Sequence, residues 1–387
     1  MLNNYFVDLH IHIGRDIYDK PVKITASKTL TLTNVLKEAS RRKGLHMVGV
    51  IDAQSPAVIE EVQQLIEQDK AYPLKDGGIQ FEDVTLILGA EVEVYDEHCH
   101  GPIHVLCFLP TIEAMQAFSY WLSTKMKNIT LSSQRYYGSG KDLQYKVKEL
   151  EGLFIPAHVF TPFKSMYGKG VQKSLTEVFD ADLIDAIELG LSSDTGMADQ
   201  IKELHDYTYI SNSDSHSLPK IAREYQQISM KEPSFKELYY ALHGVEGRKI
   251  VRNFGMNPKL GKYYTTVCQQ CFEQVAFGTE ICSHCGGRTI VNGVYDRILQ
   301  LKNNEVKNDS RPPYLYQVPL EYLPGLGPKT YENLIEAFET EMNIIHHVPY
   351  DELVDVVRPN IAKQIIMMRE GMQEVEVGGG GKYGKIK

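Results

Sequence analysis

The chain has 387 residues, of which 43% are hydrophobic and 24% are charged, a composition that is typical of folded globular proteins and excludes a largely disordered or fibrous chain. Its length predicts two or three domains. The formal net charge of −9 disfavours nonspecific coating of nucleic acid, which depends on many lysines and arginines, but leaves room for a local basic groove.

The N-terminal segment shows no targeting signal. Asn3, Asn4 and Asp8 stand where a signal peptide would have basic residues followed by an apolar stretch. The sequence also lacks a run of about 20 uninterrupted apolar residues, the length needed to cross a bilayer. We therefore expect a cytoplasmic protein without membrane association.

Residues 1–255 alternate short β-rich runs with longer amphipathic stretches, and this pattern predicts repeated βα units with a parallel sheet. The predicted strands are 6–13, 46–52, 85–94, 103–109, 152–159, 184–189 and 207–211. The predicted helices include 33–42, 57–68, 113–127 and 197–205. Seven such units favour a closed α/β barrel, in which catalytic groups lie at the C-terminal ends of strands.

Two pairs of potential metal ligands close different predicted strands. In His10-Ile11-His12 the alternation of a strand points both imidazoles to one face. Asp214 and His216 repeat this geometry with a carboxylate and an imidazole. A single His-x-His is more often structural than catalytic, but the two pairs together predict a metal site.

Glu91 and His158 close two further apolar strands, where a buried charge is costly unless it is paired or bound to a metal. The alternatives are an exposed strand-end acid and a histidine satisfied within the core. His98, His100 and His104 follow Glu91, and we expect at most two of them to be ligands. Mixed nitrogen and oxygen ligation suits zinc, manganese or iron, and clusters of such metals favour hydrolysis of phosphate esters.

These residues resemble the metal site of the PHP (polymerase and histidinol phosphatase) family over residues 1–255. The resemblance implies a distorted (βα)7 barrel with two or three divalent metals, zinc first and manganese or magnesium as alternatives. It implies ligand roles for His10, His12, Glu91, His104, His158, Asp214 and His216. Among these, we expect the catalytic groups to be Glu91, Asp214 and His216.

The chain departs from the PHP pattern after the second strand. Where the family commonly has Asp-His, this sequence has Asp52-Ala53, so either a ligand is missing or Asp52 substitutes for it. Asp16 and Asp19 are further candidate oxygen ligands, or solvated loop acids.

Cys268, Cys271, Cys282 and Cys285 form two Cys-x-x-Cys pairs within residues 256–295. Four thiolates at this spacing predict a tetrahedral zinc site, which is structural because it leaves no open position for chemistry. The alternative is a redox-active pair. Residues 296–320 are polar and rich in proline and predict a linker, and the glycine-rich residues 376–387 predict a disordered tail.

Residues 321–375 predict an all-α region in which Gly325-Leu326-Gly327 precedes a helix and resembles the turn of a helix-hairpin-helix motif. Glycines there let backbone N–H groups approach a phosphate, and Lys329 adds positive charge. Arg252 belongs to a basic strip that would suit the same DNA backbone. The alternatives are an ordinary helical turn and a basic linker.

The order of barrel, four-cysteine module and hairpin resembles the endonuclease Q family over the whole chain. The resemblance implies a repair enzyme that uses a metal-activated water to cut DNA on the 5′ side of deaminated bases (uracil, hypoxanthine, xanthine) or at abasic sites. Reading one altered base requires its extrusion into a pocket. Its expected lining is Phe163, Lys164, Tyr167, Ser192 and Ser193. The alternatives are a small-molecule phosphoesterase of the PHP type and a non-catalytic DNA-binding factor.

Overall fold

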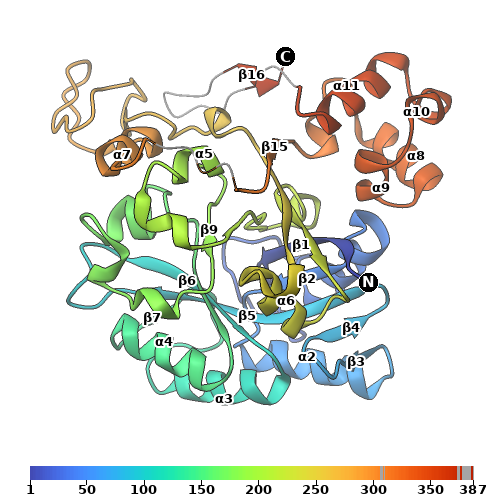
Figure 1. The fold of residues 1–387 in the computed structure, drawn as a ribbon, viewed down its shortest axis with the longest axis horizontal. Coiled ribbons are helices and arrows are strands. Elements are labelled where there is room, and N and C mark those ends of the chain that lie inside the picture. Colours follow the sequence, from blue (N-terminus) through green and yellow to red (C-terminus); the bar gives the residue numbers. More distant parts are fainter. Residues whose placement is uncertain (306–307, 309, 373–374, 377–384, 387) are drawn as a thin grey trace.

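The computed structural model describes residues 1–305, 308, 310–372, 375–376 and 385–386. An α/β barrel forms the main body, and a cysteine-containing module and a group of helices lie together at one end of it (Figure 1). Within the described ranges, no helix is long and apolar enough to span a membrane.

Seven short strands form the barrel. In order around the ring they are β1 (Asn3–Ile11), β2 (Met47–Val50), β5 (Val84–Val94), β6 (Ile103–Leu109), β8 (Leu153–Pro156), β9 (Ile187–Glu188) and β10 (Tyr209–Ile210). The backbone N–H of Val159 donates to the carbonyl of Glu188 and so joins the β8 and β9 segments. A parallel bridge between Ile11 and Ser215 closes the ring. The predicted distorted (βα)7 barrel is confirmed.

The expectation of a wholly parallel sheet is wrong. β6 runs antiparallel to both β5 and β8, because the connection from Val94 to Ile103 is too short for the crossover that parallel neighbours require. Two strands that the sequence pattern did not predict, β11 (Tyr225–Met230) and β12 (Lys249–Gly255), extend the sheet antiparallel from the other edge of β1. The fully buried Gln226 interrupts the apolar pattern of β11.

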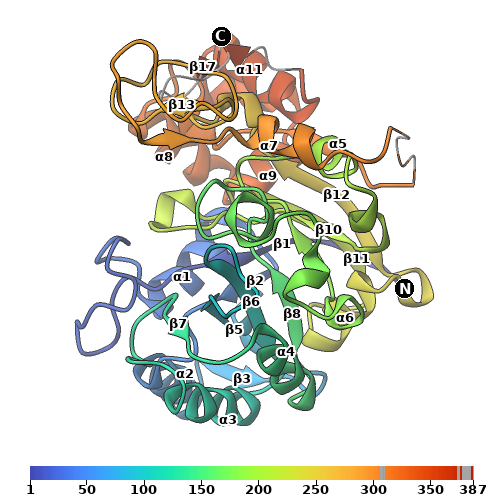
Figure 2. The same cartoon turned by 90° about the vertical axis from the view of Figure 1, so that its left-hand side faces the viewer.

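Helices and short strands cover the outside of the ring (Figure 2). The helices are α1 (Leu32–Glu38), α2 (Pro56–Glu67), α3 (Ile112–Ser123), α4 (Gly140–Glu149) and α6 (Phe235–Leu242). Three short strands add to the sheet: β4 (Ile79–Phe81) and β7 (Arg135–Tyr136) pair with β5, and β3 (Ala71–Pro73) pairs with β4. In α3 the side chain of Thr111 caps the first turn, and the buried residues follow the helical period. α1, α2 and α3 lie close to the predicted ranges 33–42, 57–68 and 113–127, whereas α4 and α6 were not among the predicted helices.

The predicted helix at 197–205 is broken into α5 (Thr195–Ala198) and a 3-10 turn over Lys202–Asp206. Asp199 lies at the break, where its carboxylate accepts hydrogen bonds from the Tyr209 hydroxyl and from Arg311. This tertiary contact accounts for the interruption.

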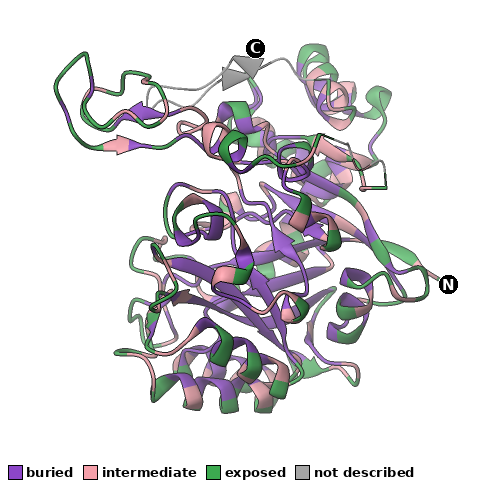
Figure 3. Cartoon of the chain, turned by 60° about the vertical axis from the view of Figure 1, so that its left-hand side comes forward, coloured by how far each residue is buried: buried purple, intermediate pink, exposed green. Residues whose placement is uncertain are grey.

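The strands of the barrel are largely buried (Figure 3). Their buried side chains are apolar at one end of the barrel interior and polar at the other. Side chains such as Leu9, Ile87 and Phe108 fill it, and α6 seals the closed end with Phe235 and Leu238. Polar side chains are buried at the opposite end, where the predicted metal ligands lie. The packed core therefore confines any chemistry to one mouth of the barrel.

The predicted linker at 296–320 includes regular elements among its described residues. It contains most of α7 (Val294–Leu301) and all of β15 (Tyr314–Tyr316), which pairs in parallel with β12. Just before β15, Arg311 is anchored to the barrel, because its guanidinium donates to the backbone carbonyls of Leu204 and Tyr207. Of the predicted tail at 376–387 only residues 376, 385 and 386 are described, in the paired strands β16 (Val375–Glu376) and β17 (Lys385–Ile386). The rest of the tail lies outside the described residues.

Four helices form the C-terminal region: α8 (Pro328–Phe338), α9 (Glu341–His346), α10 (Tyr350–Val356) and α11 (Pro359–Arg369). This region is fastened to the barrel by buried polar contacts. The Lys43 ammonium pairs with the Glu341 carboxylate, and both side chains are 3% exposed. His346 stacks on Phe6 with ring centroids 4.5 Å apart. Burial lowers the pKa of His346 to about 3, so its ring is neutral. Its Nε2 lies 2.7 Å from the hydroxyl oxygen of Tyr225, which itself donates to Gln317 Oε1.

We predict that Glu341→Ala destabilises the protein by about 3–5 kcal/mol, because it leaves the Lys43 charge buried without a partner. Urea unfolding should show this loss, and the double variant Lys43→Met/Glu341→Leu should recover much of it. The exposed pair of Arg41 and Glu82 is the control, since breaking a surface pair costs about 1 kcal/mol or less. An equal, small loss of stability in Glu341→Ala and in a single variant that breaks the Arg41–Glu82 pair would contradict the prediction.

Candidate active site

The histidines of β1 and the acid that follows β10 form the first group of ligand atoms. His10 Nε2 and His12 Nε2 lie 3.4 and 3.5 Å from Asp214 Oδ1, and the three potential ligand atoms lie within 4.8 Å of one another. Both Nε2 atoms are buried without a hydrogen-bond partner in the described structure. A buried, unpaired acceptor is costly, so this geometry fits a cation between the three residues.

Glu91, His104 and His158 form a second group with the same spacing limit. Glu91 Oε1 lies 2.7 Å from His104 Nδ1 and 3.3 Å from His158 Nε2. The Glu91 carboxylate is also 3.7 Å from the Nε2 atoms of both His10 and His12. Glu91 therefore stands between the two groups and could bridge two metals.

Charge and backbone shape support this arrangement. Burial would raise the pKa of Glu91, but His104 and Lys23 hold it well below its usual range. Asp214 is likewise held well below its usual pKa by His10 and His12, against the effect of burial. His158 and Asp214 adopt φ values of 31° and 45°, which non-glycine residues rarely do and which functional sites often contain. The site therefore offers ionised carboxylates to cations.

A second layer of carboxylates orients the β1 histidines. Asp52, expected as a possible ligand, instead accepts from His12 Nδ1 at 3.1 Å and from the Ile13 N–H at 2.7 Å. It thus lies behind His12, on the ring nitrogen opposite Nε2. Glu188 does the same for His10 Nδ1 at 2.9 Å and is itself held by Asn212 at 2.8 Å. Its position at the end of the predicted strand 184–189 was the signal for a role that the site prediction omitted.

Of the other predicted ligands, only His216 remains near the site. Its Nδ1 lies 3.6 Å from Asp214 Oδ1, and its ring is 4.6 Å from that of His12, but it belongs to neither group. The side chains of His98 and His100 are 60% and 51% exposed, away from both groups. Asp16 accepts two backbone N–H groups of its own loop, and Asp19 is exposed.

The four cysteines lie together in the small module built on β13 (Val267–Cys268) and β14 (Ile290–Val291). The sulfurs of Cys268 and Cys285 are 3.6 Å apart, and those of Cys271 and Cys282 are 3.7 Å apart. Two thiolates bound at about 2.3 Å to tetrahedral zinc would be separated by about 3.8 Å. The sulfur geometry fits the predicted structural zinc site.

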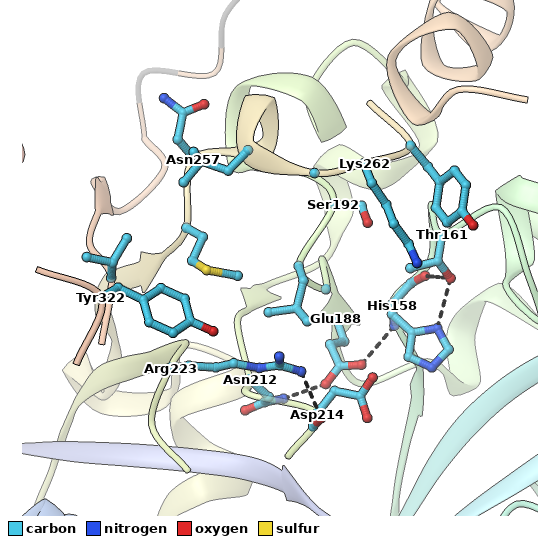
Figure 4. Close-up of a pocket in the computed structure, with 17 residues that line it drawn as sticks. His158, Thr161, Glu188, Ser192, Asn212, Asp214, Arg223, Asn257, Lys262 and Tyr322 are labelled. Carbon is cyan, nitrogen blue, oxygen red and sulfur yellow. Dashed lines mark hydrogen bonds between the residues drawn. The ribbon is translucent and has the colours of Figure 1, made fainter. Parts of the chain in front are cut away.

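A cavity of about 750 Å³ opens beside the two ligand groups, with His158, Glu188 and Asp214 in its wall (Figure 4). Ser192, Arg223, Lys262 and Tyr322 project toward it from other segments. Among the predicted base-pocket residues, only Ser192 lines this cavity. Arg223, Lys262, Tyr263 and Tyr322 were missed, because these residues follow His158 by 65 to 164 positions in the sequence and meet it only in the fold.

Tyr167 and Ser193 are corrections to the predicted pocket. Tyr167 is fully buried and donates to Glu203 at 2.9 Å, and Ser193 is buried and donates to the Leu189 carbonyl. Phe163 reaches the cavity indirectly, through an edge contact with Tyr263 at 5.6 Å. Lys164 is turned to Glu93 at 2.8 Å. Neither of these two residues lines the cavity.

No family model matches the chain. The protein YqxK of Bacillus subtilis is 50% identical over 386 residues, with all of both chains covered. The lesion-specific endonuclease PfuEndoQ of Pyrococcus furiosus is 31% identical and superposes with a TM-score of 0.85, covering 100% of this chain and 95% of that one. Endonuclease Q in complex with a 27-mer duplex that carries an abasic lesion at the active site gives 0.84 at 31% identity, covering 100% and 96%.

This chain belongs to the endonuclease Q family. The family predicted from the order of the three modules is thereby confirmed, and the protein is a metal-dependent DNA endonuclease. The ligand groups at the barrel mouth are where such an endonuclease would hold its metals.

The predicted DNA-binding residues of this endonuclease are exposed. Gly325 and Gly327 lie at the turn before α8, and Lys329 lies in the first turn of that helix. Gly325 has a φ of 84° that favours glycine. Arg252 is exposed on β12. Arg248, from the same basic strip, is instead buried and bound by both oxygens of Glu237, so it is a structural residue.

We predict that Asp52→Asn weakens barrel-metal affinity or activity about 10- to 100-fold, the usual effect of losing a carboxylate behind a ligating histidine. Metal titration followed by mass spectrometry should still find the wild-type number of barrel metals at saturation. Asp19→Asn, at an exposed loop position, is the control and should change neither quantity. Loss of one full metal equivalent in Asp52→Asn would make Asp52 a ligand and refute its assignment behind His12.

Proposed function

We propose that this endonuclease acts in DNA repair and hydrolyses the phosphodiester on the 5′ side of deaminated bases, uracil, hypoxanthine and xanthine, or at abasic sites. The observation that carries the proposal is the direct junction of the ligand groups with the 750 Å³ cavity, because His158 and Asp214 belong to both. A nucleotide turned into this cavity would leave its 5′ phosphate beside the metal ligands. Two relatives support this substrate class. PfuEndoQ is a lesion-specific endonuclease, and endonuclease Q forms a complex with a duplex that carries an abasic lesion at the active site.

In this proposal His10, His12 and Asp214 hold one barrel metal, and Glu91, His104 and His158 hold a second. Mixed histidine and carboxylate ligation suits zinc, with manganese or magnesium as alternatives. When bound, such metals supply an activated water and neutralise the charge that develops on the phosphate. Cys268, Cys271, Cys282 and Cys285 would hold a further, structural zinc.

The chain's own residues then position the substrate. Glu188 and Asp52 fix the ring orientation of the β1 histidines, so the Nε2 atoms face the phosphate site. The Arg223 guanidinium is held in the cavity wall by the carbonyls of Ser213 and Asp214, where a cation would suit a phosphate oxygen. His216, about one third exposed beside Asp214, is the proposed remaining catalytic group because it can contact the substrate from the open side.

In this proposal each part of the chain has its own role. Residues 1–255 carry out hydrolysis, and residues 256–295 form a zinc module that also contributes Leu260, Lys262 and Tyr263 to the cavity wall. Residues 321–375 hold the duplex through the Gly325 to Lys329 turn, and Arg252 contacts the DNA backbone. Backbone contacts of this kind fix position without reading sequence.

The test is cleavage of duplexes that carry uracil, hypoxanthine, xanthine, an abasic site or no lesion, with added zinc, manganese or magnesium. We expect cuts only on the 5′ side of the lesions. We also expect Asp214→Asn to abolish cleavage while duplex affinity stays within about twofold, because the variant removes a metal ligand and leaves the hairpin intact. Equal cutting of the undamaged duplex would refute lesion specificity, and phosphatase activity without any DNA cleavage would favour a small-molecule phosphoesterase.

We predict that Gly325→Ala/Gly327→Val weakens duplex binding about tenfold without lowering the cleavage rate at saturating DNA. A Cβ at either glycine meets no protein atom within 4 Å, so the new side chains block the approach of a phosphate and do not disturb packing. Gly244→Ala is the matched control, since Gly244 also has a positive φ and open space around its Cβ. Fluorescence anisotropy of labelled duplexes measures the affinity for DNA. If the double variant and the control lose the same affinity, backbone strain explains the loss and the turn has no specific role in binding phosphate.

A further inference from the structure

A second row of side chains leads away from the metal ligands along β5. Side chains of a strand alternate between its faces, and Val92 and Val94 are fully buried on one face. Glu91 and Glu93 therefore share the other face, and Tyr95 continues it just beyond the strand. The row starts at the ligand groups and runs toward the surface.

β7 adds a parallel row beside it. Glu93 pairs with Arg135 and Val94 pairs with Tyr136 in the ladder between β5 and β7. Because Tyr136 is fully buried with Val94, Arg135 and Tyr137 point to the open face. Nearer the barrel centre the same segment touches the ligands, since Ser133 donates to Glu91 and Ser132 lies 3.2 Å from His12 Nδ1. The two rows form one continuous track.

At the outer end of the track, Arg135 lies between two tyrosine rings. Its guanidinium carbon is 4.8 Å from the centre of the Tyr95 ring and 5.2 Å from that of Tyr137. The rings are 38% and 48% exposed, and Lys127 Nζ lies 5.8 Å from the Tyr137 centre. Tyr95, Arg135 and Tyr137 border a surface hollow of about 350 Å³. We call Tyr95, Arg135 and Tyr137 the outer platform.

The acids near the outer platform are largely occupied. Asp96 accepts the backbone N–H groups of Gly140 and His98. Glu93 is paired with Lys164, whose Nζ lies 2.8 Å from Glu93 Oε2. Glu97, on the rim, is 89% exposed and is screened by solvent. The platform therefore offers cations and aromatic faces, the combination that binds single nucleic-acid strands.

We propose that the outer platform binds the DNA strand on the 5′ side of the scissile phosphate, with a base against Tyr95 or Tyr137 and a phosphate near Arg135. The polarity rests on the proposed function. If the lesion nucleotide occupies the large cavity, whose wall contains His158 and Asp214 but no residue of the track, the strand preceding the phosphate leaves on the Ser133 side.

The strand geometry sets the reach of this subsite. Alternate residues on one strand face are about 6.8 Å apart, so Tyr95 lies about 13 Å from Glu91. A stacked DNA strand advances about 3.4 Å per nucleotide. The outer platform should therefore meet the nucleotide about four positions upstream of the cut.

The experiment measures cleavage of lesion duplexes that differ in the length of the cut strand on the 5′ side of the lesion. One set has a 5′ flank shorter than about three nucleotides, which should not reach the outer platform, and the other has a flank longer than about six, which should. Tyr137→Ala and Tyr95→Ala should each raise KM about 5- to 10-fold on the long flank, the effect of losing one stacked base, and leave kcat unchanged. On the short flank the variants and the wild type should have the same KM. Tyr137→Phe, which keeps the ring, should behave as wild type.

Tyr72→Ala is the control, because Tyr72 is also an exposed tyrosine and lies on β3, at the far edge of the sheet. Thermal unfolding identifies any variant with a folding defect, and the two single tyrosine variants give independent readings. A KM increase that is the same on both flanks, or one that follows the length of the 3′ flank, would overturn the proposal. If the proposed lesion specificity is wrong, the enzyme will cleave undamaged duplex as well. The dependence of KM on the length of the 5′ flank can then still be measured on that undamaged duplex.

Discussion

The buried carboxylate of Glu91 is the group around which the site is arranged. It lies within 3.7 Å of nitrogen atoms of His10, His12, His104 and His158, and Lys23 Nζ approaches its other side at 3.3 Å. A carboxylate this deeply buried needs strong compensation. Three β-strands, β1, β5 and β6, and the loop after β8 bring these partners together. The metal site and the closure of the barrel mouth are therefore one and the same arrangement.

Rigidity around this carboxylate comes from a second layer of hydrogen bonds. Asp52 and Glu188 each bind the far ring nitrogen of a β1 histidine, and Asn212 fixes Glu188 in turn. Such a layer selects the tautomer and ring orientation of a ligand before any metal arrives. It follows that the ligating nitrogens are held at the barrel mouth by the fold, whose apolar interior supplies the fixed strand ends.

The added modules form a rim on the same side as the barrel mouth (Figure 1). The four-cysteine module and the segment before α8 reach the large cavity through Tyr263 and Tyr322. The helical region is fastened through Glu341 and His346. The large cavity is therefore built jointly by the barrel, the four-cysteine module and the segment before α8. A barrel alone would have the ligands but an incomplete pocket wall.

The sequence by itself determined the residues that bring chemistry to the site. Alternation in a strand places His10 and His12 on one face, and the Cys-x-x-Cys spacing predicts a metal-binding knuckle. The order of the modules indicated the family. All three inferences depend on local spacing or on order along the chain. It also predicted seven strands of the barrel. It did not predict the antiparallel direction of β6 or the strands β11 and β12, whose polar residues hide the apolar pattern.

Only the tertiary structure decided how these residues are used. Asp52 and Glu188 end strands just as Glu91 does, yet they lie behind histidines, because the role of a strand-end acid depends on which ring nitrogen it faces. Tyr167 and Ser193 follow strand ends as Ser192 does, but they point into the core. Contacts between segments far apart in sequence made these choices, since the large cavity joins residues from His158 to Tyr322. Local spacing fixes which groups are present, and packing fixes what each of them touches.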